Sequence, residues 1–118
     1  MALDPVVKVR ELLDLLNGSN DGAYLSILKR LFKVLDEQHP SLPEGLRRRV
    51  VYSLQVVIIQ CKEGYASSTQ AVLCLGTLPL WSEPVRAWLR DRYSYENTAS
   101  REKVAEAIAR VLKANAIL

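Results

Sequence analysis

The chain has few side chains whose type and spacing would support catalysis or metal binding. Its single histidine, His39, stands between Gln38 and Pro40. No Gly-x-Ser-x-Gly motif accompanies it, so a polar group near a helix end is the simpler interpretation. Cys61 and Cys74 lie in apolar runs and lack the C-x-x-C spacing of a zinc or redox site. We therefore expect no catalytic residue, no metal site and no cofactor, and two buried thiols are favoured over a disulfide.

One cluster of possible binding residues is the arginine triplet 47–49. Positive charge near a helix start opposes the helix dipole and destabilises the helix slightly. Three arginines at such a position therefore suggest a role in binding. With three cations of the preceding helix, the triplet forms a candidate basic face for phosphates, anionic lipid headgroups or an acidic partner. The six residues are Lys29, Arg30, Lys33, Arg47, Arg48 and Arg49. The alternative is that the triplet pairs with Asp36, Glu37 and Glu44, which are close in the sequence.

A second cluster lies between Trp81 and Tyr95, which holds both tryptophans, two of the five tyrosines and three arginines. These residue types are enriched at the energetic centres of protein interfaces, and they also stack on single-stranded bases. Because Trp81 and Trp88 are seven residues apart, they share a helix face, and core packing is the alternative for both. The candidate partner-binding residues are Trp88, Arg86, Arg90, Arg92, Tyr93 and Tyr95.

The valine- and isoleucine-rich stretch 46–63 is the segment that should position these clusters. Its β-branched content alone would favour a strand. The apolar positions Leu46, Val50, Leu54, Val57 and Cys61 instead follow helical spacing, with Pro43 before the stretch and Gly64 after it. We predict a buried central helix over roughly 44–63, around which the other helices pack.

Capping residues and apolar spacing predict five further helices. The first runs from Asp4-Pro5 to Asn17-Gly18, and the second starts at Ser19 or Asp21 and ends before the extended link His39–Pro43. A short helix follows the central one from about Ser67 and closes near Gly76. The fifth helix runs from Ser82-Glu83-Pro84 to about Tyr93. The pattern then breaks at Tyr95-Glu96-Asn97, and the sixth helix begins at Thr98.

Length and composition predict one all-α domain over residues 1–118. With 118 residues, 49% of them hydrophobic and 25% charged, the chain can bury a single core. We expect a single compact bundle of about six helices. An array of hairpins, which would pair the second helix with the third and the fourth with the fifth, is less favoured because no fixed-period repeat is found. The chain shows no secretory signal, no bilayer-length apolar run and no lipidation motif, so we expect a cytoplasmic location.

These features favour a non-enzymatic protein–protein interaction domain, acting as an adaptor, an accessory protein or a self-assembling unit through the aromatic and arginine surface. The alternative is a module that binds nucleic acid, such as RNA, or an anionic membrane surface through the basic face. The net charge of +3 is low for a dedicated nucleic-acid binder. Small viral matrix and nucleocapsid-associated proteins, and HEAT-type hairpins, share the composition, but none of their motifs is present.

Overall fold

The computed structural model describes residues 4–60, 66–78 and 83–114, and the regular structure in these segments is entirely helical. The six helices are α1 (Pro5–Asn17), α2 (Asp21–Gln38), α3 (Glu44–Gln60), α4 (Ala66–Gly76), α5 (Glu83–Thr98) and α6 (Glu102–Ala114). The prediction of an all-α bundle of about six helices is therefore confirmed. Within the described segments, every helix is too short or too polar to cross a membrane.

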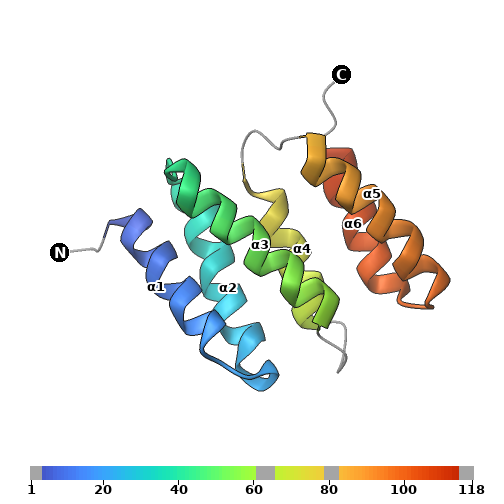
Figure 1. The fold of residues 1–118 in the computed structure, drawn as a ribbon, viewed down its shortest axis with the longest axis horizontal. Coiled ribbons are helices and arrows are strands. Elements are labelled where there is room, and N and C mark those ends of the chain that lie inside the picture. Colours follow the sequence, from blue (N-terminus) through green and yellow to red (C-terminus); the bar gives the residue numbers. More distant parts are fainter. Residues whose placement is uncertain (1–3, 61–65, 79–82, 115–118) are drawn as a thin grey trace.

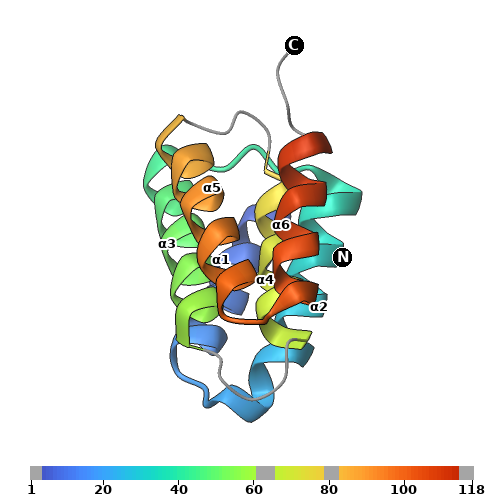
Figure 2. The same cartoon turned by 90° about the vertical axis from the view of Figure 1, so that its right-hand side faces the viewer.

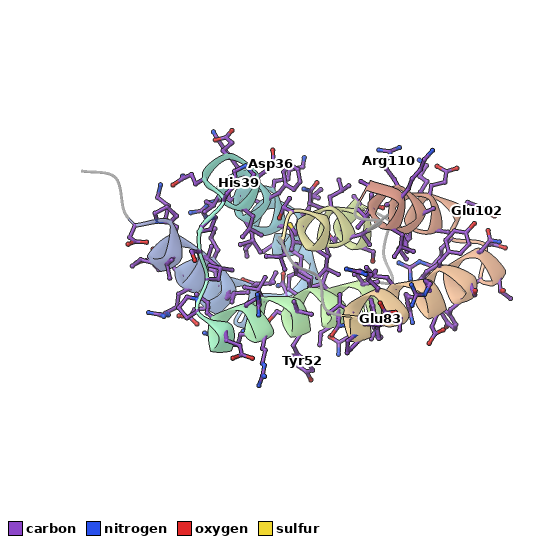
Figure 3. All side chains as sticks on the ribbon, turned by 90° about the horizontal axis from the view of Figure 1, so that it is seen from above. Asp36, His39, Tyr52, Glu83, Glu102 and Arg110 are labelled. Carbon is purple, nitrogen blue, oxygen red and sulfur yellow. The ribbon has the colours of Figure 1, made fainter. Side chains whose placement is uncertain are left out.

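The helices form three antiparallel hairpins that lie side by side (Figure 1). α1 packs on α2, α3 on α4, and α5 on α6. Figures 2 and 3 show two layers, with α3 and α5 on one side and α2, α4 and α6 on the other. α1 contacts α3 and belongs to the first layer. The molecule is consequently flat, with extents of 46 × 37 × 21 Å.

Each hairpin contacts only the next one along the chain, which is the neighbour pattern of an α-solenoid. The hairpin array considered from the sequence paired the second helix with the third and the fourth with the fifth. The observed hairpins are shifted by one helix, because α2 and α3 do not contact each other and neither do α4 and α5. Pro40 and Pro43 lie in the link between α2 and α3, which has no regular structure and carries the chain from one layer to the other. The extended link predicted from His39 onward is wrong at its first residue, because His39 adopts the left-handed conformation that ends α2.

The helix with the most neighbours is α4, which packs against α2, α3 and α6. No residue of α4 is charged, and its small buried residues, such as Ser68 and Ala71, allow close approach on several sides. The predicted central helix exists as α3, but it contacts only α1 and α4 and exposes Tyr52 and Ile59. The central place in the bundle therefore belongs to α4.

A capping side chain accounts for the start of α1, whereas α2 begins after Asn20 without a side-chain cap and ends at His39. Asp4 Oδ1 accepts a hydrogen bond from the backbone N–H of Val6 at 2.8 Å, with a proline at the first helical position, as predicted. The N-cap of α2 is Asn20, not Ser19 or Asp21. His39 ends α2 in the left-handed conformation, with φ of 42°, which places this single histidine on an exposed helix cap.

The predicted end of the fifth helix near Tyr93 is wrong, as is the start of the sixth at Thr98. α5 continues through residues 95–97 to Thr98, and α6 begins at Glu102. The physical reason is Glu96, whose carboxylate is completely buried and paired with Arg92 one helical turn earlier. This pair holds the helical conformation across residues that by themselves favour a turn. The chain reverses at Ser100, where φ is 62°.

Cys74 is a buried thiol in the core of α4, as predicted, whereas Cys61 lies outside the described residues. The Cys74 Sγ donates a hydrogen bond to the backbone carbonyl of Leu28 at 3.4 Å. Burial raises the pKa of Cys74 from 9.0 to about 12, so its thiolate fraction near neutral pH is about a thousandfold below that of an exposed thiol.

We expect Cys74 to resist a thiol reagent as long as the protein is folded. In the Cys61→Ser variant, where Cys74 is the sole cysteine, labelling with a chromogenic disulfide at pH 8 should proceed only as fast as the protein opens. The same variant in denaturant should react within the mixing time. A fast phase in the native protein would contradict the buried position of the thiol.

Candidate interaction surface

The exposed large apolar side chains of the described segments all belong to the layer formed by α1, α3 and α5. They are Val7, Leu15, Tyr52, Ile59, Tyr93 and Tyr95. In Figure 3, Tyr52 points outward on the α3 side, whereas Asp36 and Arg110 lie on the opposite side of the molecule. The exposed large apolar side chains of the described segments therefore come from one layer, but they do not all point the same way, since Leu15 lines a groove between α1 and α2 and Tyr93 and Tyr95 lie on different sides of α5.

The outer side of α3 contributes Tyr52 and Ile59, which are 69% and 47% exposed. They are seven residues apart, so they occupy one line along the helix, on the side away from the buried Leu54. Arg48 lies one turn before Tyr52, where its guanidinium is 2.7 Å from the Glu44 carboxylate. Tyr52 and Ile59 were not among the predicted binding residues, although their spacing opposite the buried side of the helix was a signal in the sequence.

The predicted partner-binding residues of α5 divide into exposed and structural groups. Tyr93 and Tyr95 are 37% and 58% exposed, and Arg90 is also exposed. Arg90 forms an ion pair with Glu83, which also lies 3.5 Å from Arg86. We use the name aromatic surface for the exposed Tyr52 and Ile59 of α3 together with the exposed Tyr93 and Tyr95 of α5. Tyr93 and Tyr95 are two residues apart, so they lie on different sides of α5.

Trp88 and Arg92, two further predicted partner-binding residues, are turned towards the interior. Trp88 is half-buried and packs against the hydrophobic core, which matches the core alternative considered for it. The Arg92 side chain is only 16% exposed. Trp81 lies outside the described residues. α5 is otherwise a polar helix, since Leu89 is its one fully buried apolar residue and α6 is the one described helix that it contacts.

A buried ionic network fixes α5 to the turn that precedes α6 and to α4. Glu96 Oε1 accepts hydrogen bonds from Arg92 Nε at 2.7 Å and from Arg101 Nη1 at 3.0 Å. The second carboxylate oxygen, Oε2, lies 2.9 Å from the same Arg101 nitrogen. Arg101 Nη2 also donates to Ser68 Oγ at 2.9 Å. The network therefore joins the last hairpin to the central helix α4.

The same network positions one residue of the aromatic surface. The guanidinium carbon of Arg92 lies 4.3 Å from the centre of the Tyr95 ring, within the range of a cation–π contact. Because Glu96 holds the other side of the guanidinium, the Arg92 side chain is fixed on two sides. The Tyr95 ring is thus held in place while 58% of the residue remains exposed. Such a preorganised aromatic side chain loses little conformational entropy on binding.

The structure does not gather the six residues of the predicted basic face. Lys29 lines a groove between α2, α4 and α6, whereas Arg30 and Lys33 line a different groove between α1 and α2. Arg49 pairs across to Asp14 of α1 at 2.7 Å, and Arg48 pairs with Glu44 as the pairing alternative proposed. The remaining residue, Arg47, is half-buried at the start of α3. The division follows from the placement of α2 and α3 in different layers.

Neither a metal-binding cluster nor a known relative points to a further site in the described segments. In residues 4–60, 66–78 and 83–114, no three histidine, cysteine, aspartate or glutamate side chains are close enough to hold a metal ion together. No family model, curated protein or solved structure matches the chain. The assignment of a function therefore rests on the geometry described above.

Proposed function

We propose that this protein is a non-enzymatic interaction domain that binds another protein through the aromatic surface on α3 and α5. The observation that supports the proposal most is the distribution of exposed large apolar side chains, which in the described segments all come from one of the two layers. Three of the four residues of the aromatic surface are tyrosines. Tyrosine is enriched at interface hot spots because it buries a large area with few rotatable bonds.

The charges around the aromatic surface also fit a protein partner. Arg48 and Arg90 are exposed, and each is paired with a carboxylate of its own helix. Arginine is enriched at interfaces, where its planar group stacks on aromatic rings and binds carboxylates with two hydrogen bonds. A partner that covered the tyrosines would place these ion pairs at the rim, where they favour specificity more than affinity.

The proposal predicts that crosslinks form from the α3 and α5 side alone. A photoreactive phenylalanine analogue would be placed at position 52 or 95, and at position 26 or 109 as controls on exposed sites of α2 and α6. In cells of the species that encodes the chain, we expect products from positions 52 and 95 only. Equal crosslinking from both sets would contradict a one-sided interface.

A partner identified in this way gives a quantitative second test. The Tyr52→Ser/Tyr95→Ser variant should bind it at least about thirtyfold more weakly, the effect of losing a hot spot of about 2 kcal/mol. A Ser26→Ala/Lys113→Ala control, altered on α2 and α6, should bind within about twofold of the unmodified protein. Light scattering on the purified chain would show whether the bound protein is a second copy. An unchanged affinity in the tyrosine variant would reject this surface.

The alternative function, binding to nucleic acid or to an anionic membrane surface, remains a prediction. The separate positions of the six residues of the candidate basic face argue against it. Phosphate binding would weaken steeply as salt rises, whereas an aromatic interface would depend little on salt. A titration with RNA and with anionic vesicles at low and physiological salt distinguishes the two functions.

A further inference from the structure

A groove on the opposite side of the molecule has a different chemistry from the aromatic surface. It lies between α2, α4 and α6, has a volume of about 460 Å³, and is independent of the surface used in the proposed function. Its lining residues are Leu25, Lys29, Ala66, Thr69, Gln70 and Lys103. The volume falls in the range of sites that bind small molecules.

The groove brings two cations to the two sides of the short central helix. Lys29 comes from α2 and Lys103 from α6, and both helices pack against α4. Neither lysine forms an ion pair within the described part of the chain. None of the described residues that line the groove is acidic. Two like charges therefore share one concave site without a carboxylate among its lining residues to balance them.

Two uncharged hydrogen-bonding side chains of α4 also line the groove. Thr69 and Gln70 of α4 are half-buried, and their side chains make no hydrogen bond among the described residues. A hydroxyl and a carboxamide can both donate to an anionic oxygen. Leu25, Ala66 and the aliphatic stems of the lysines supply apolar walls beside these donors.

We propose that this groove binds the phosphate monoester group of a small ligand with an apolar or ring-shaped body. A phosphate monoester carries a charge of about −1.5 to −2 at neutral pH and three acceptor oxygens. Its charge matches the two ammonium groups, and its oxygens can also accept from Thr69 and Gln70. A single carboxylate would balance only one of the lysines. The apolar walls would contact the body of the ligand.

Another groove, between α1 and α2, is also lined by cations, and it differs from the groove across α4 in its carboxylates. The groove between α1 and α2 is lined by Lys8, Arg30 and Lys33, but Glu11 and Glu37 also line it. A phosphate placed there would meet two carboxylates as well as the cations, and this repulsion opposes binding. We therefore assign the phosphate site to the groove across α4.

The test is a titration of the ¹⁵N-labelled protein with phenyl phosphate, followed by NMR at physiological salt. We expect saturable shifts of the amide signals of residues 66, 69 and 70. Lys29→Gln and Lys103→Gln should each weaken binding by about five- to tenfold, the effect of losing one charge-assisted hydrogen bond at a partly exposed site. Inorganic phosphate should bind the same residues more weakly, because it lacks the apolar body.

Lys113→Gln is the matched control, since it removes the same charge from α6, about 15 Å along the helix from Lys103. This variant should bind phenyl phosphate within about twofold of the unmodified protein. Vesicles containing phosphatidic acid form a second arm. Retention on them that depends on Lys29 and Lys103, without binding to phenyl phosphate, would assign the phosphate group to a lipid.

Three results would overturn the proposal. The first is an absence of saturable shifts up to about 20 mM phenyl phosphate, well beyond the millimolar range of a weak ligand, together with no vesicle retention. The second is equal weakening in Lys113→Gln, which would indicate an effect of net charge only. The third is unchanged binding in both Lys29→Gln and Lys103→Gln, which would place the ligand elsewhere.

Discussion

Replacing Glu96 by glutamine is expected to lower the free energy of unfolding by about 3 kcal/mol. Glu96 is completely buried, and its carboxylate meets the guanidinium groups of Arg92 and Arg101. Glutamine keeps the shape of the side chain but removes the charge, so two largely buried cations would lose their common partner. Because natural domains are stable by only about 5–15 kcal/mol, this loss is a large share of the total.

The expected value lies at the lower end of the range for breaking a buried ion pair. The two arginine side chains are 16% and 17% exposed, so part of each guanidinium is still hydrated after the change. Loss of the pair should also loosen the end of α5, since Glu96 and Arg92 are one helical turn apart. We therefore expect the amide protons around residues 93–98 to exchange with solvent faster than those of α4.

Chemical denaturation of the purified variants measures the effect. Glu106→Gln, which removes an exposed carboxylate of α6 with no ion pair among the described residues, should change stability by no more than about 0.5 kcal/mol. The triple variant Arg92→Met/Glu96→Leu/Arg101→Met should recover most of the stability lost in Glu96→Gln, because it buries no charge. Equal stability of Glu96→Gln and Glu106→Gln would contradict the buried network.

The helices were largely predictable from the sequence because their ends carry local signals. Asp4 followed by proline, and the prolines at 40 and 43, affect only the few residues next to them. Their effects can therefore be predicted without knowledge of the fold. The predicted break at residues 95–97 failed for the opposite reason. Glu96 favours a helix there through its pair with Arg92 one turn earlier, and Arg101 completes the pairing from across the turn. The contribution of Arg101 depends on the fold.

The central place of α4 was missed although the sequence contained a sign of it. The stretch 66–76 has no charged residue, whereas 44–60 has three arginines and the exposed Tyr52. A helix without charge can be covered on all sides, while a helix with charges along one side must keep that side in water. The prediction of α3 as the central helix rested on its many valine and isoleucine residues. Branching at Cβ determines the shape of a side chain and not the number of helices that pack around it.

The candidate sites were harder to predict than the fold, since they depend on which residues the layers bring to one surface. The basic residues of α2 and α3 are close in sequence, but the extended link between these helices places them on different sides of the molecule. Lys29 and Lys103 are 74 residues apart and line one groove. Among the aromatic residues, exposure separated Tyr95 from Trp88, which spacing alone could not do.

Replacing Gly76 by alanine should destabilise the protein by about 1–2 kcal/mol, although alanine is the better helix former. Gly76 is the last residue of α4, where the helix meets α6. A Cβ atom at this position would lie 2.9 Å and 3.2 Å from the two methyl groups of Val111. Valine is rigid about its first side-chain bond, and Val111 is 5% exposed, so the methyl groups cannot turn away freely. Overpacking costs about 1–3 kcal/mol, and the rigid contact with Val111 favours the upper half of that range. After a helix-propensity gain of about 1 kcal/mol, a net loss of about 1–2 kcal/mol remains.

The decisive measurement is the same substitution in a Val111→Ala background. Val111→Ala removes both methyl groups and leaves the Cβ of residue 111 at 3.6 Å from the added Cβ, an ordinary contact. Gly76→Ala should then stabilise the protein by about 0.5–1 kcal/mol, through helix propensity and partial filling of the space that the valine left. A double-mutant cycle in denaturant should show this change of sign. If Gly76→Ala destabilised both backgrounds equally, the close approach of α4 to α6 at this point could not be the cause, and the loss would have to come from the backbone of Gly76.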